Sequence, residues 1–286
     1  MTILEAIFQA IIQGLTEFLP VSSSGHLSLF QHFTGNDGEG ALMFSAILHL
    51  GTLVAVFVAF WDTIKALIIE FFRLCADIFR GKFSFKEMNG ERNMIFMIIL
   101  STAMLLPFFI FKGFFESFAE DSSILAEGIC FLYTAFILIM SDKCVKGTKN
   151  PEDITVKNAA TVGIFQGIAL LPGVSRSGST ISSGLFCGFS RETAVRYSFI
   201  LGIPAILGGC VLEVGDAVKE GMTFEISYLI GFVVAAIVGI MAIKMVSWLV
   251  KSDKFKYFGY YTAVLGVVVI TIAIIEIVIG HPLTIN

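Results

Sequence analysis

The sequence predicts an all-α polytopic membrane protein, on the evidence of its composition and of six long apolar stretches. Of its 286 residues, 56% are hydrophobic and 15% are charged, whereas a soluble domain carries about 25% charged residues. The mean hydropathy is +0.86. Each stretch comes close to the roughly 20 residues that a helix needs to cross a bilayer. They cover about 41–61, 93–113, 124–141, 192–213, 227–250 and 258–279.

Two further apolar segments, at 2–33 and 158–190, are interrupted by clusters of proline, serine and glycine. The first interruption reads Pro-Val-Ser-Ser-Ser-Gly-His at 20–26, and the second reads Pro-Gly-Val-Ser-Arg-Ser-Gly-Ser at 172–179. Three of the four flanking halves are too short to cross a bilayer, so we expect two re-entrant helical hairpins beside the six transmembrane helices.

The two interruptions resemble each other, which predicts an internal repeat within one membrane domain of residues 1–286. Gln13 and Gln166 each precede a glycine, and each lies eight residues before the valine of a Val-Ser-x-Ser-Gly sequence. The copies are expected at 1–141 and 158–280, each with one hairpin and three crossings. Because three is odd, the second copy is inverted. Inverted repeats with broken helices commonly form a polar site near the middle of the membrane.

The distribution of Lys and Arg predicts the orientation in the membrane. The segments 62–92, 142–157, 189–196 and 251–257 hold 15 of the 19 Lys and Arg residues. By the positive-inside rule this side is cytoplasmic, and both termini face outward. The apolar spacing Ile64, Leu67, Ile68, Phe71, Cys75 and Ile78 further predicts an amphipathic helix along the inner surface.

The first hairpin contains a carboxylate at membrane depth. Gln13 and Glu17 are four residues apart and therefore share one helix face. A carboxylate in this place is costly unless it has a partner or water. Glu17 is predicted to be a metal ligand or a general base. The alternative is an interfacial glutamate that reaches outward.

The second hairpin contributes Arg176, the only arginine within either hairpin. A guanidinium binds phosphate oxygens through two parallel hydrogen bonds and stabilises the charge of phosphoryl transfer. The alternative is that Arg176 is buried only to pair with Glu17. The two roles are compatible, because a resting pair can open for a substrate.

Hydroxyl groups and glycines surround these two charges. Together they predict a cradle for an oxyanion, since short Ser/Gly turns before helices expose backbone N–H groups. For any single serine, capping of a broken helix is the alternative. The residues concerned are Ser22, Ser23, Ser24, Gly25, Gly173, Ser175, Ser177, Gly178, Ser179 and Thr180. His26 closes the first interruption and is preferred over His32 and His49 as a proton donor or base.

The sequence contains none of the motifs that bind nucleic acid, nucleotides or zinc, but it offers groups that suit a divalent cation. The net charge of −4 comes without a long basic run, which argues against a nucleic-acid-binding protein. Neither a dinucleotide-binding GxGxxG motif nor a phosphate-binding GxxxxGK loop occurs. The cysteines lack zinc-site spacing. A carboxylate beside hydroxyl groups suits a divalent cation, Mg²⁺ first and Ca²⁺ second.

The two interruptions and the residues before them resemble the motifs of a known family. Gln13 to His26 resemble the [E/Q]xxxE and SSxGH motifs of the bacitracin-resistance undecaprenyl-diphosphatases, and Pro172 to Thr180 resemble their PGxSRSxxT motif. The resemblance extends over the whole chain in the number and order of segments.

The resemblance implies a substrate, a location and roles for several residues. The protein would hydrolyse undecaprenyl diphosphate to the monophosphate and inorganic phosphate, and so recycle the lipid carrier of peptidoglycan synthesis. It would lie in the bacterial inner membrane with its site open to the periplasmic face, and would need a divalent cation. The family's acid, histidine and arginine fall on Glu17, His26 and Arg176, and its serine on Ser22 or Ser23. Gln13 is the neutral variant of the first motif position.

Three questions stay open from the sequence. The attacking group is a serine, Ser23 before Ser22, or a metal-activated water. A membrane transporter or flippase of an anionic lipid is the rival function, because inverted repeats are common in transporters. A homodimer is a further option, since Gly231, Ala235, Ala236 and Gly239 form a small-residue face.

Overall fold

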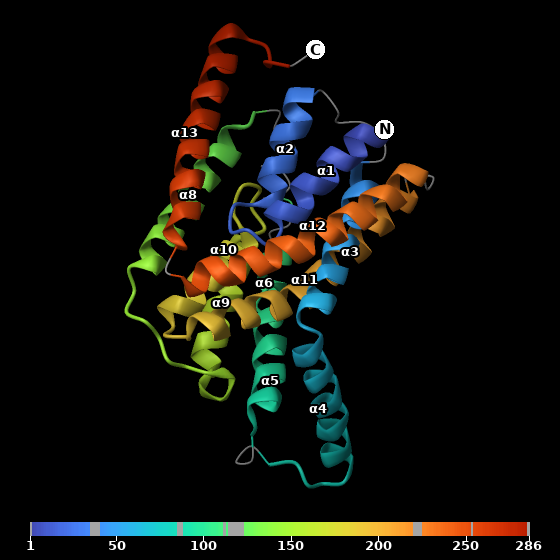
Figure 1. The fold of residues 1–286 in the computed structure, drawn as a ribbon, viewed down its shortest axis with the longest axis vertical. Coiled ribbons are helices and arrows are strands. Elements are labelled where there is room, and N and C mark those ends of the chain that lie inside the picture. The colour runs from blue at the N-terminus through green and yellow to red at the C-terminus, as the bar shows by residue number, and fades with distance from the viewer. Residues whose placement is uncertain are drawn as a thin grey trace.

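The computed structural model describes residues 2–34, 41–84, 88–110, 113, 123–219, 225–252 and 254–284, and this part of the chain is largely helical (Figure 1). The first half contains α1 (Ile3–Thr16), α2 (Ser23–Thr34), α3 (Ala41–Ala59), α4 (Trp61–Phe79), α5 (Gly90–Ala103), α6 (Leu106–Ile110) and α8 (Leu125–Asp142). The second half contains a 3-10 turn (Pro151–Asp153), α9 (Val156–Ile168), α10 (Arg176–Phe186), α11 (Arg191–Lys219), α12 (Ile226–Lys251) and α13 (Lys256–Ile279).

The predicted crossings coincide with long apolar helices. Five segments of the described chain are long and apolar enough to span a membrane: Gly90–Phe108, Leu125–Asp142, Arg191–Gly215, Ile226–Lys251 and Lys256–Ile279. A sixth candidate is the pair Met43–Ala59 and Trp61–Phe79, which meets the criterion only as a pair and is bent by 86° at a short break. In lipid a helix satisfies every backbone polar group internally, which is why these sequences are helical. The protein is a multi-pass membrane protein.

Both interrupted segments form helical pairs, as predicted. In the first pair the chain leaves α1 through Pro20, which has no N–H to continue a helix, and turns at Ser22 with a left-handed φ of 73°. In the second pair the turn uses Gly173 at a φ of 89°. The Ser175 side chain then caps α10 by accepting a hydrogen bond from the backbone N–H of Gly178.

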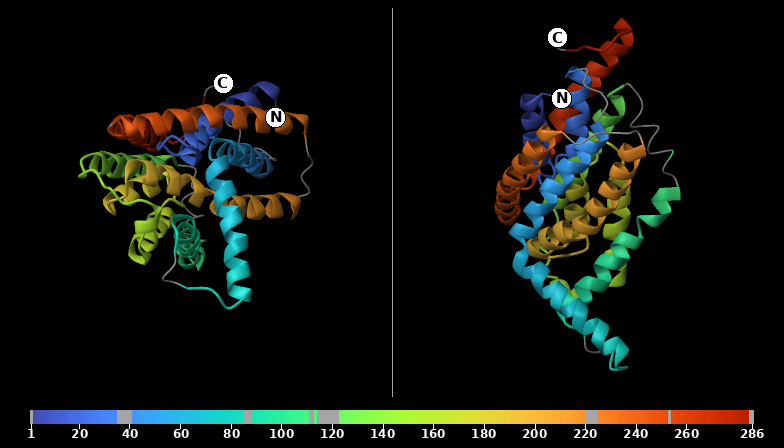
Figure 2. Two further views of the ribbon diagram at one scale, coloured as in Figure 1. Left: turned by 60° about the horizontal axis from the view of Figure 1, so that its bottom comes forward. Right: turned by 90° about the vertical axis from the view of Figure 1, so that its right-hand side faces the viewer.

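Helices from the two halves pack against each other, as the views in Figures 1 and 2 show. α8 lies along α13, α3 packs on both α11 and α12, and α1 packs on α12. The pairs α3–α11 and α8–α13 are two of the three pairs that the predicted repeat makes equivalent, and such contacts are expected of halves related by a two-fold axis. The repeat and its inversion stay predictions.

The small-residue face of α12 is buried inside the protein. A Cβ at Gly231 would meet Phe44, and one at Gly239 would meet Ala55 and Phe18. This corrects the role assigned to the face from the sequence: it packs α12 against α3 and α1 and is not free to form a dimer. The small-residue face was the observation that suggested a homodimer, and it no longer supports one.

The helix predicted over Ile64 to Ile78 is present as α4. Its buried residues are Ile64, Leu67, Glu70 and Leu74, whereas Ile68, Phe71 and Ile78 are exposed. Glu70 is buried in an ion pair with Arg92 at the start of α5, which donates to it at 2.8 Å. The prediction that α4 lies along the inner surface stays open.

Close helix packing at Gly51 predicts a stability effect. A Cβ there would lie 2.5 Å from the backbone oxygen of Phe232 on α12, so Gly51→Ala forces α3 and α12 apart. Overpacking of this kind costs about 1–3 kcal/mol. We expect a lower melting temperature in detergent. The matched control is Gly208→Ala on α11, where an added Cβ meets nothing within 4 Å. Equal melting temperatures for the two variants would contradict the prediction.

Candidate active site

A cavity of about 350 Å³ lies where the two helical hairpins meet. Its walls come from both hairpins, from α3 and α11, and from Leu105 between α5 and α6. The polar residues that line it are Thr16, Glu17, Ser22, Ser23, Ser24, His49, Gln166, Ser175, Arg176 and Glu213. The sequence prediction that the two hairpins converge on one polar site is therefore confirmed.

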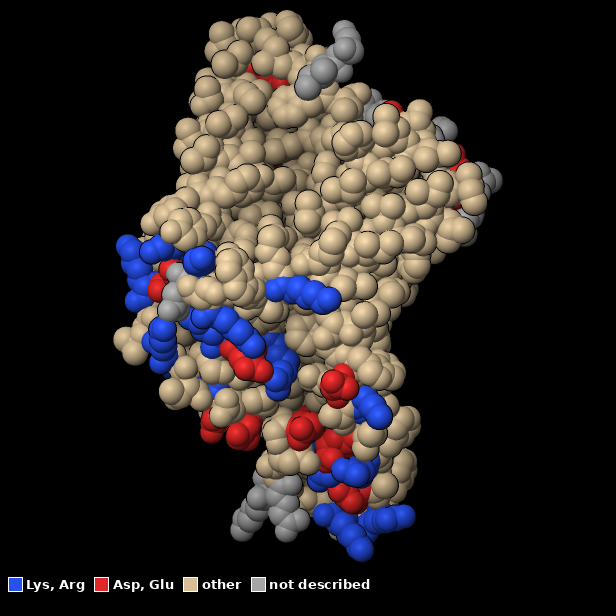
Figure 3. All heavy atoms as spheres, in the orientation of Figure 1, with Lys and Arg blue, Asp and Glu red and all other residues tan. Residues whose placement is uncertain are grey.

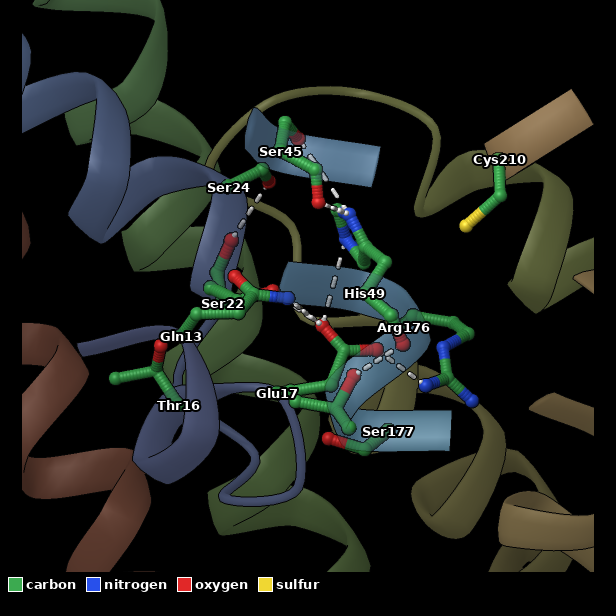
Figure 4. A network of polar contacts seen from close by, with 12 residues as sticks. Gln13, Thr16, Glu17, Ser22, Ser24, Ser45, His49, Arg176, Ser177 and Cys210 are labelled. Atoms are coloured by element: carbon green, nitrogen blue, oxygen red, sulfur yellow. Dashed lines mark hydrogen bonds and ion pairs between the residues drawn. The ribbon is translucent and has the colours of Figure 1, made fainter. Parts of the chain in front are cut away.

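The centre of the site is an ion pair between the hairpins. Arg176 Nη2 donates to Glu17 Oε1 at 2.6 Å, although the residues are 159 positions apart in the chain (Figure 4). The Glu17 side chain is 6% exposed and that of Arg176 is 16% exposed. Burial of two charges is tolerated only where each has a partner of good geometry. Both the acid and the arginine predicted from the sequence thus face the same cavity.

The second oxygen of Glu17 collects the neighbouring donors. Gln13 Nε2 donates to Glu17 Oε2 at 3.1 Å, as their spacing on one helix face requires. The Ser23 hydroxyl donates to the same oxygen at 2.7 Å. Gln13 is fully buried behind Glu17 and does not line the cavity. It holds the carboxylate in place, so its neutral amide acts here as a donor.

The structure separates the roles of Ser22 and Ser23. Ser22 has the left-handed backbone, is 3% exposed, and its hydroxyl accepts a hydrogen bond from the Gly25 N–H at 3.3 Å. It therefore caps α2. Ser23 is the first residue of α2, and its hydroxyl points at a carboxylate inside the cavity. Of the two, Ser23 has the geometry of an activated nucleophile.

The second terminal nitrogen of the Arg176 guanidinium, Nη1, lies against α11. It is buried and has no hydrogen-bond partner among the described residues. A Cβ at Gly202 on α11 would lie 2.2 Å from this nitrogen. Gly202 thus leaves room for the guanidinium, a role that the sequence did not reveal.

Several predicted binding residues hold the hairpins together and do not line the cavity. Ser177 donates to the Leu19 carbonyl at 3.3 Å, and Thr180 to the Arg176 carbonyl at 2.9 Å. Gly25 packs against Phe131 and Gly173. The residues in this group are Gly25, Gly173, Ser177, Gly178, Ser179 and Thr180. The contacts of Ser177, Thr180 and Gly25 are therefore contacts within and between the hairpins and their neighbours.

His26 lies outside the cavity lining. Its Nδ1 is 2.6 Å from the Ser22 carbonyl oxygen, and its Nε2 is 2.8 Å from the Tyr261 hydroxyl. A carbonyl oxygen only accepts, so in the neutral imidazole Nδ1 carries the proton and Nε2 accepts from Tyr261. In this arrangement His26 supports the Ser22 turn and has no proton directed at the cavity.

Two further ionisable residues line the cavity: His49, ranked below His26 from the sequence, and Glu213, which was not among the predicted residues. His49 Nε2 lies 3.9 Å from Glu17 Oε2, and its Nδ1 lies 3.8 Å from Glu213 Oε2. His49 comes from α3 and Glu213 from α11, outside either interrupted motif. Both residues could have been found from the sequence, because an ionisable side chain within an apolar span is costly and therefore marks a functional site.

The predicted divalent cation, held by Glu17 together with the substrate phosphates, stays a prediction. No group of three or more His, Cys, Asp or Glu side chains in the described ranges is placed to bind a metal. Both oxygens of Glu17 already accept hydrogen bonds, from Arg176, Ser23 and Gln13. No catalytic step is therefore assigned to a cation.

Comparison with known proteins places the chain in a family. The sequence pattern described as bacitracin resistance protein BacA matches residues 6–268. A protein of Alkaliphilus metalliredigens named undecaprenyl-diphosphatase is 40% identical over 279 residues, which cover 96% of this chain and 100% of that protein. Proteins with the same name from Halothermothrix orenii and Methanosphaera stadtmanae are 37% and 38% identical, each over 96% of this chain and 99% of the relative. The chain with this Glu17–Arg176 site therefore belongs to the BacA family of bacitracin resistance proteins.

Proposed function

We propose that the protein is a membrane phosphatase that hydrolyses undecaprenyl diphosphate to undecaprenyl phosphate and inorganic phosphate. The observation that carries this proposal is the contact of Glu17 with both Arg176 and the Ser23 hydroxyl at one buried cavity. Phosphoryl transfer requires a base, a nucleophile and a positive charge on the phosphate, which Glu17, the Ser23 hydroxyl and the Arg176 guanidinium can supply. The names of the relatives supply the lipid.

The geometry supports attack by Ser23 on the terminal phosphorus. Glu17 takes the hydroxyl proton through the existing 2.7 Å hydrogen bond as the Ser23 oxygen bonds to phosphorus. The bond from that phosphorus to the bridging oxygen breaks, and undecaprenyl phosphate leaves. Water then hydrolyses the phosphoserine to release inorganic phosphate. Arg176 neutralises the phosphoryl oxygens, with Nη1 as the free donor.

The apolar wall of the cavity supports a lipid substrate. It consists of Leu105, Ala169, Leu170, Val174, Ala205, Ile206 and Leu212, beside Gly209 on α11. The head group would lie among the polar residues, and the chain would leave between α9 and α11 toward the bilayer.

Filling this wall should block the lipid. An added Cβ at Gly209 meets nothing within 4 Å, so Gly209→Leu places a side chain in the cavity without a backbone clash. We expect kcat/KM for undecaprenyl diphosphate to fall about tenfold or more, the scale of one well-placed hydrophobic clash in a pocket. The control is Gly208→Leu, whose position has the same free space but does not line the cavity. A loss as large in the control as in Gly209→Leu would contradict this route for the chain.

The distribution of charge supports a location in the bacterial inner membrane with the cavity open to the outer side. Figure 3 shows Lys and Arg side chains gathered in the lower half of the molecule, whereas both termini lie at the upper end in Figure 1. If the basic end is cytoplasmic, Arg191 marks the inner end of α11. The cavity residues Ala205 to Glu213 then lie in the outer half of that helix.

The deciding experiment is release of inorganic phosphate from undecaprenyl diphosphate by the purified full-length protein in detergent. We expect the wild type to release phosphate and Glu17→Gln to release almost none. Absence of release by the wild type, with Mg²⁺ and with Ca²⁺, would overturn the proposal and favour the rival transporter or flippase, which needs no hydrolysis. The same assay with EDTA tests the predicted cation, which would enter with the diphosphate oxygens as ligands.

A further inference from the structure

One buried amide at the cavity is not used by the mechanism. Gln166 lies on α9, is 2% exposed and borders the cavity. Neither its Oε1 nor its Nε2 has a hydrogen-bond partner among the described residues. Leaving a buried polar group unpaired is unfavourable, so such a group in a cavity indicates a ligand or water that completes it.

The corresponding glutamine of the first hairpin explains why Gln166 is unpaired. Gln13 occupies the same place in its motif and donates to Glu17, which lies four residues later on the same helix face. The residue four positions after Gln166 is Leu170, which offers no acceptor. The same amide thus holds the catalytic carboxylate in one hairpin and is left available in the other.

The packing of α9 fixes the position of this amide. A Cβ at Gly163 would lie 2.6 Å from the backbone oxygen of Ser101, and one at Gly167 would lie 2.2 Å from the Phe108 ring. α9 is therefore held tightly against α5 three residues before Gln166 and against α6 one residue after it. A rigid helix gives a binding side chain the precision that recognition of a ligand needs.

The neighbours of Gln166 indicate which part of the substrate it meets. Glu17, Ser23 and Arg176 occupy the end of the cavity assigned to the terminal phosphate. Gln166 shares its helix end with Ala169 and Leu170, which belong to the apolar wall assigned to the chain. In a lipid diphosphate, the phosphate that carries the lipid lies between the terminal phosphate and the chain.

We infer that Gln166 is a specificity-determining residue that binds the lipid-side phosphate through its amide N–H. This inference rests on the proposed function. The phosphate that carries the lipid occurs in both the diphosphate substrate and the lipid product. Inorganic phosphate, the other product, comes from the terminal phosphate and does not bind at Gln166.

The test compares two products as inhibitors of the full-length enzyme. In Gln166→Leu, KM for undecaprenyl diphosphate and Ki for undecaprenyl phosphate are expected to rise together by about tenfold, which corresponds to about 1.4 kcal/mol. Ki for inorganic phosphate is expected to stay unchanged. Gln166→Glu, which keeps the size but adds negative charge, should raise the first two constants further. If Gln166→Leu does not fold, Gln166→Glu allows the same comparison between Ki for undecaprenyl phosphate and Ki for inorganic phosphate.

Each other outcome overturns the inference. An equal rise in Ki for inorganic phosphate would place Gln166 at the terminal phosphate, and a fall in kcat with both Ki values unchanged would make it merely structural. Ile164→Ala, an exposed position on the same helix, controls for disturbance of α9. If the wild type releases no phosphate, the proposed function fails. Direct binding of undecaprenyl phosphate to the wild type and to Gln166→Leu still decides the role of Gln166.

Discussion

Replacing Arg176 by methionine is expected to lower kcat for undecaprenyl diphosphate by about a hundredfold to a thousandfold, the cost of removing one preorganised donor from a transition-state charge. The guanidinium is the cationic side chain within hydrogen-bonding distance of Glu17, at 2.6 Å, and no other Lys or Arg lines the cavity in the described part of the chain. Arg176→Lys should recover part of the rate, because it keeps the charge but loses the paired donors.

The same replacement should also destabilise the fold. It leaves the Glu17 carboxylate, with 6% of its side chain exposed, without its guanidinium partner, and breaking a buried pair from one side costs about 3–5 kcal/mol. A double-mutant cycle with Glu17→Gln separates the two effects: the double variant should regain stability but not activity. Arg191→Met is the control, because Arg191 pairs with Asp142 at 3.5 Å and does not line the cavity. Activity of Arg176→Met within tenfold of the wild type would contradict its role.

Replacing Ser23 by alanine is expected to lower kcat by at least about a thousandfold, as removal of a covalent nucleophile does. The Ser23 hydroxyl is the one that donates to Glu17, at 2.7 Å. Ser22→Ala should instead keep activity within about tenfold and lose about 1 kcal/mol of stability, because Ser22 caps α2.

Mass spectrometry of enzyme quenched during turnover gives an independent reading of the Ser23 prediction. Phosphate should be found on the peptide that contains Ser23, and Ser28→Ala is a control on the same helix, since Ser28 donates to Glu127 away from the cavity. Full activity in Ser23→Ala with no phosphopeptide in the wild type would mean that water attacks directly.

The sequence motif favoured His26 over His49, whereas His49 is the histidine that lines the cavity. His26 adjoins the serine turn in sequence, but its ring lies between the Ser22 carbonyl and Tyr261. His49 has no motif around it, yet the packing of α3 beside α1 and α11 brings it within 4 Å of Glu17 and Glu213. Sequence adjacency placed His26 near the right turn, and it could not tell on which side of the helix the cavity lies.

By itself, the sequence determined the long apolar helices, the two interrupted hairpins and the shared helix face of Gln13 and Glu17. Each follows from local chemistry: a chain in lipid satisfies its backbone as a helix, proline and glycine end it, and residues four apart share a face. Only the tertiary structure decided that Glu17 meets Arg176, that Ser23 and not Ser22 faces the carboxylate, and that Gln166 is left without a partner. Those contacts join residues from different helices or depend on one left-handed turn, so they are set by how the helices pack, which no short stretch of sequence encodes.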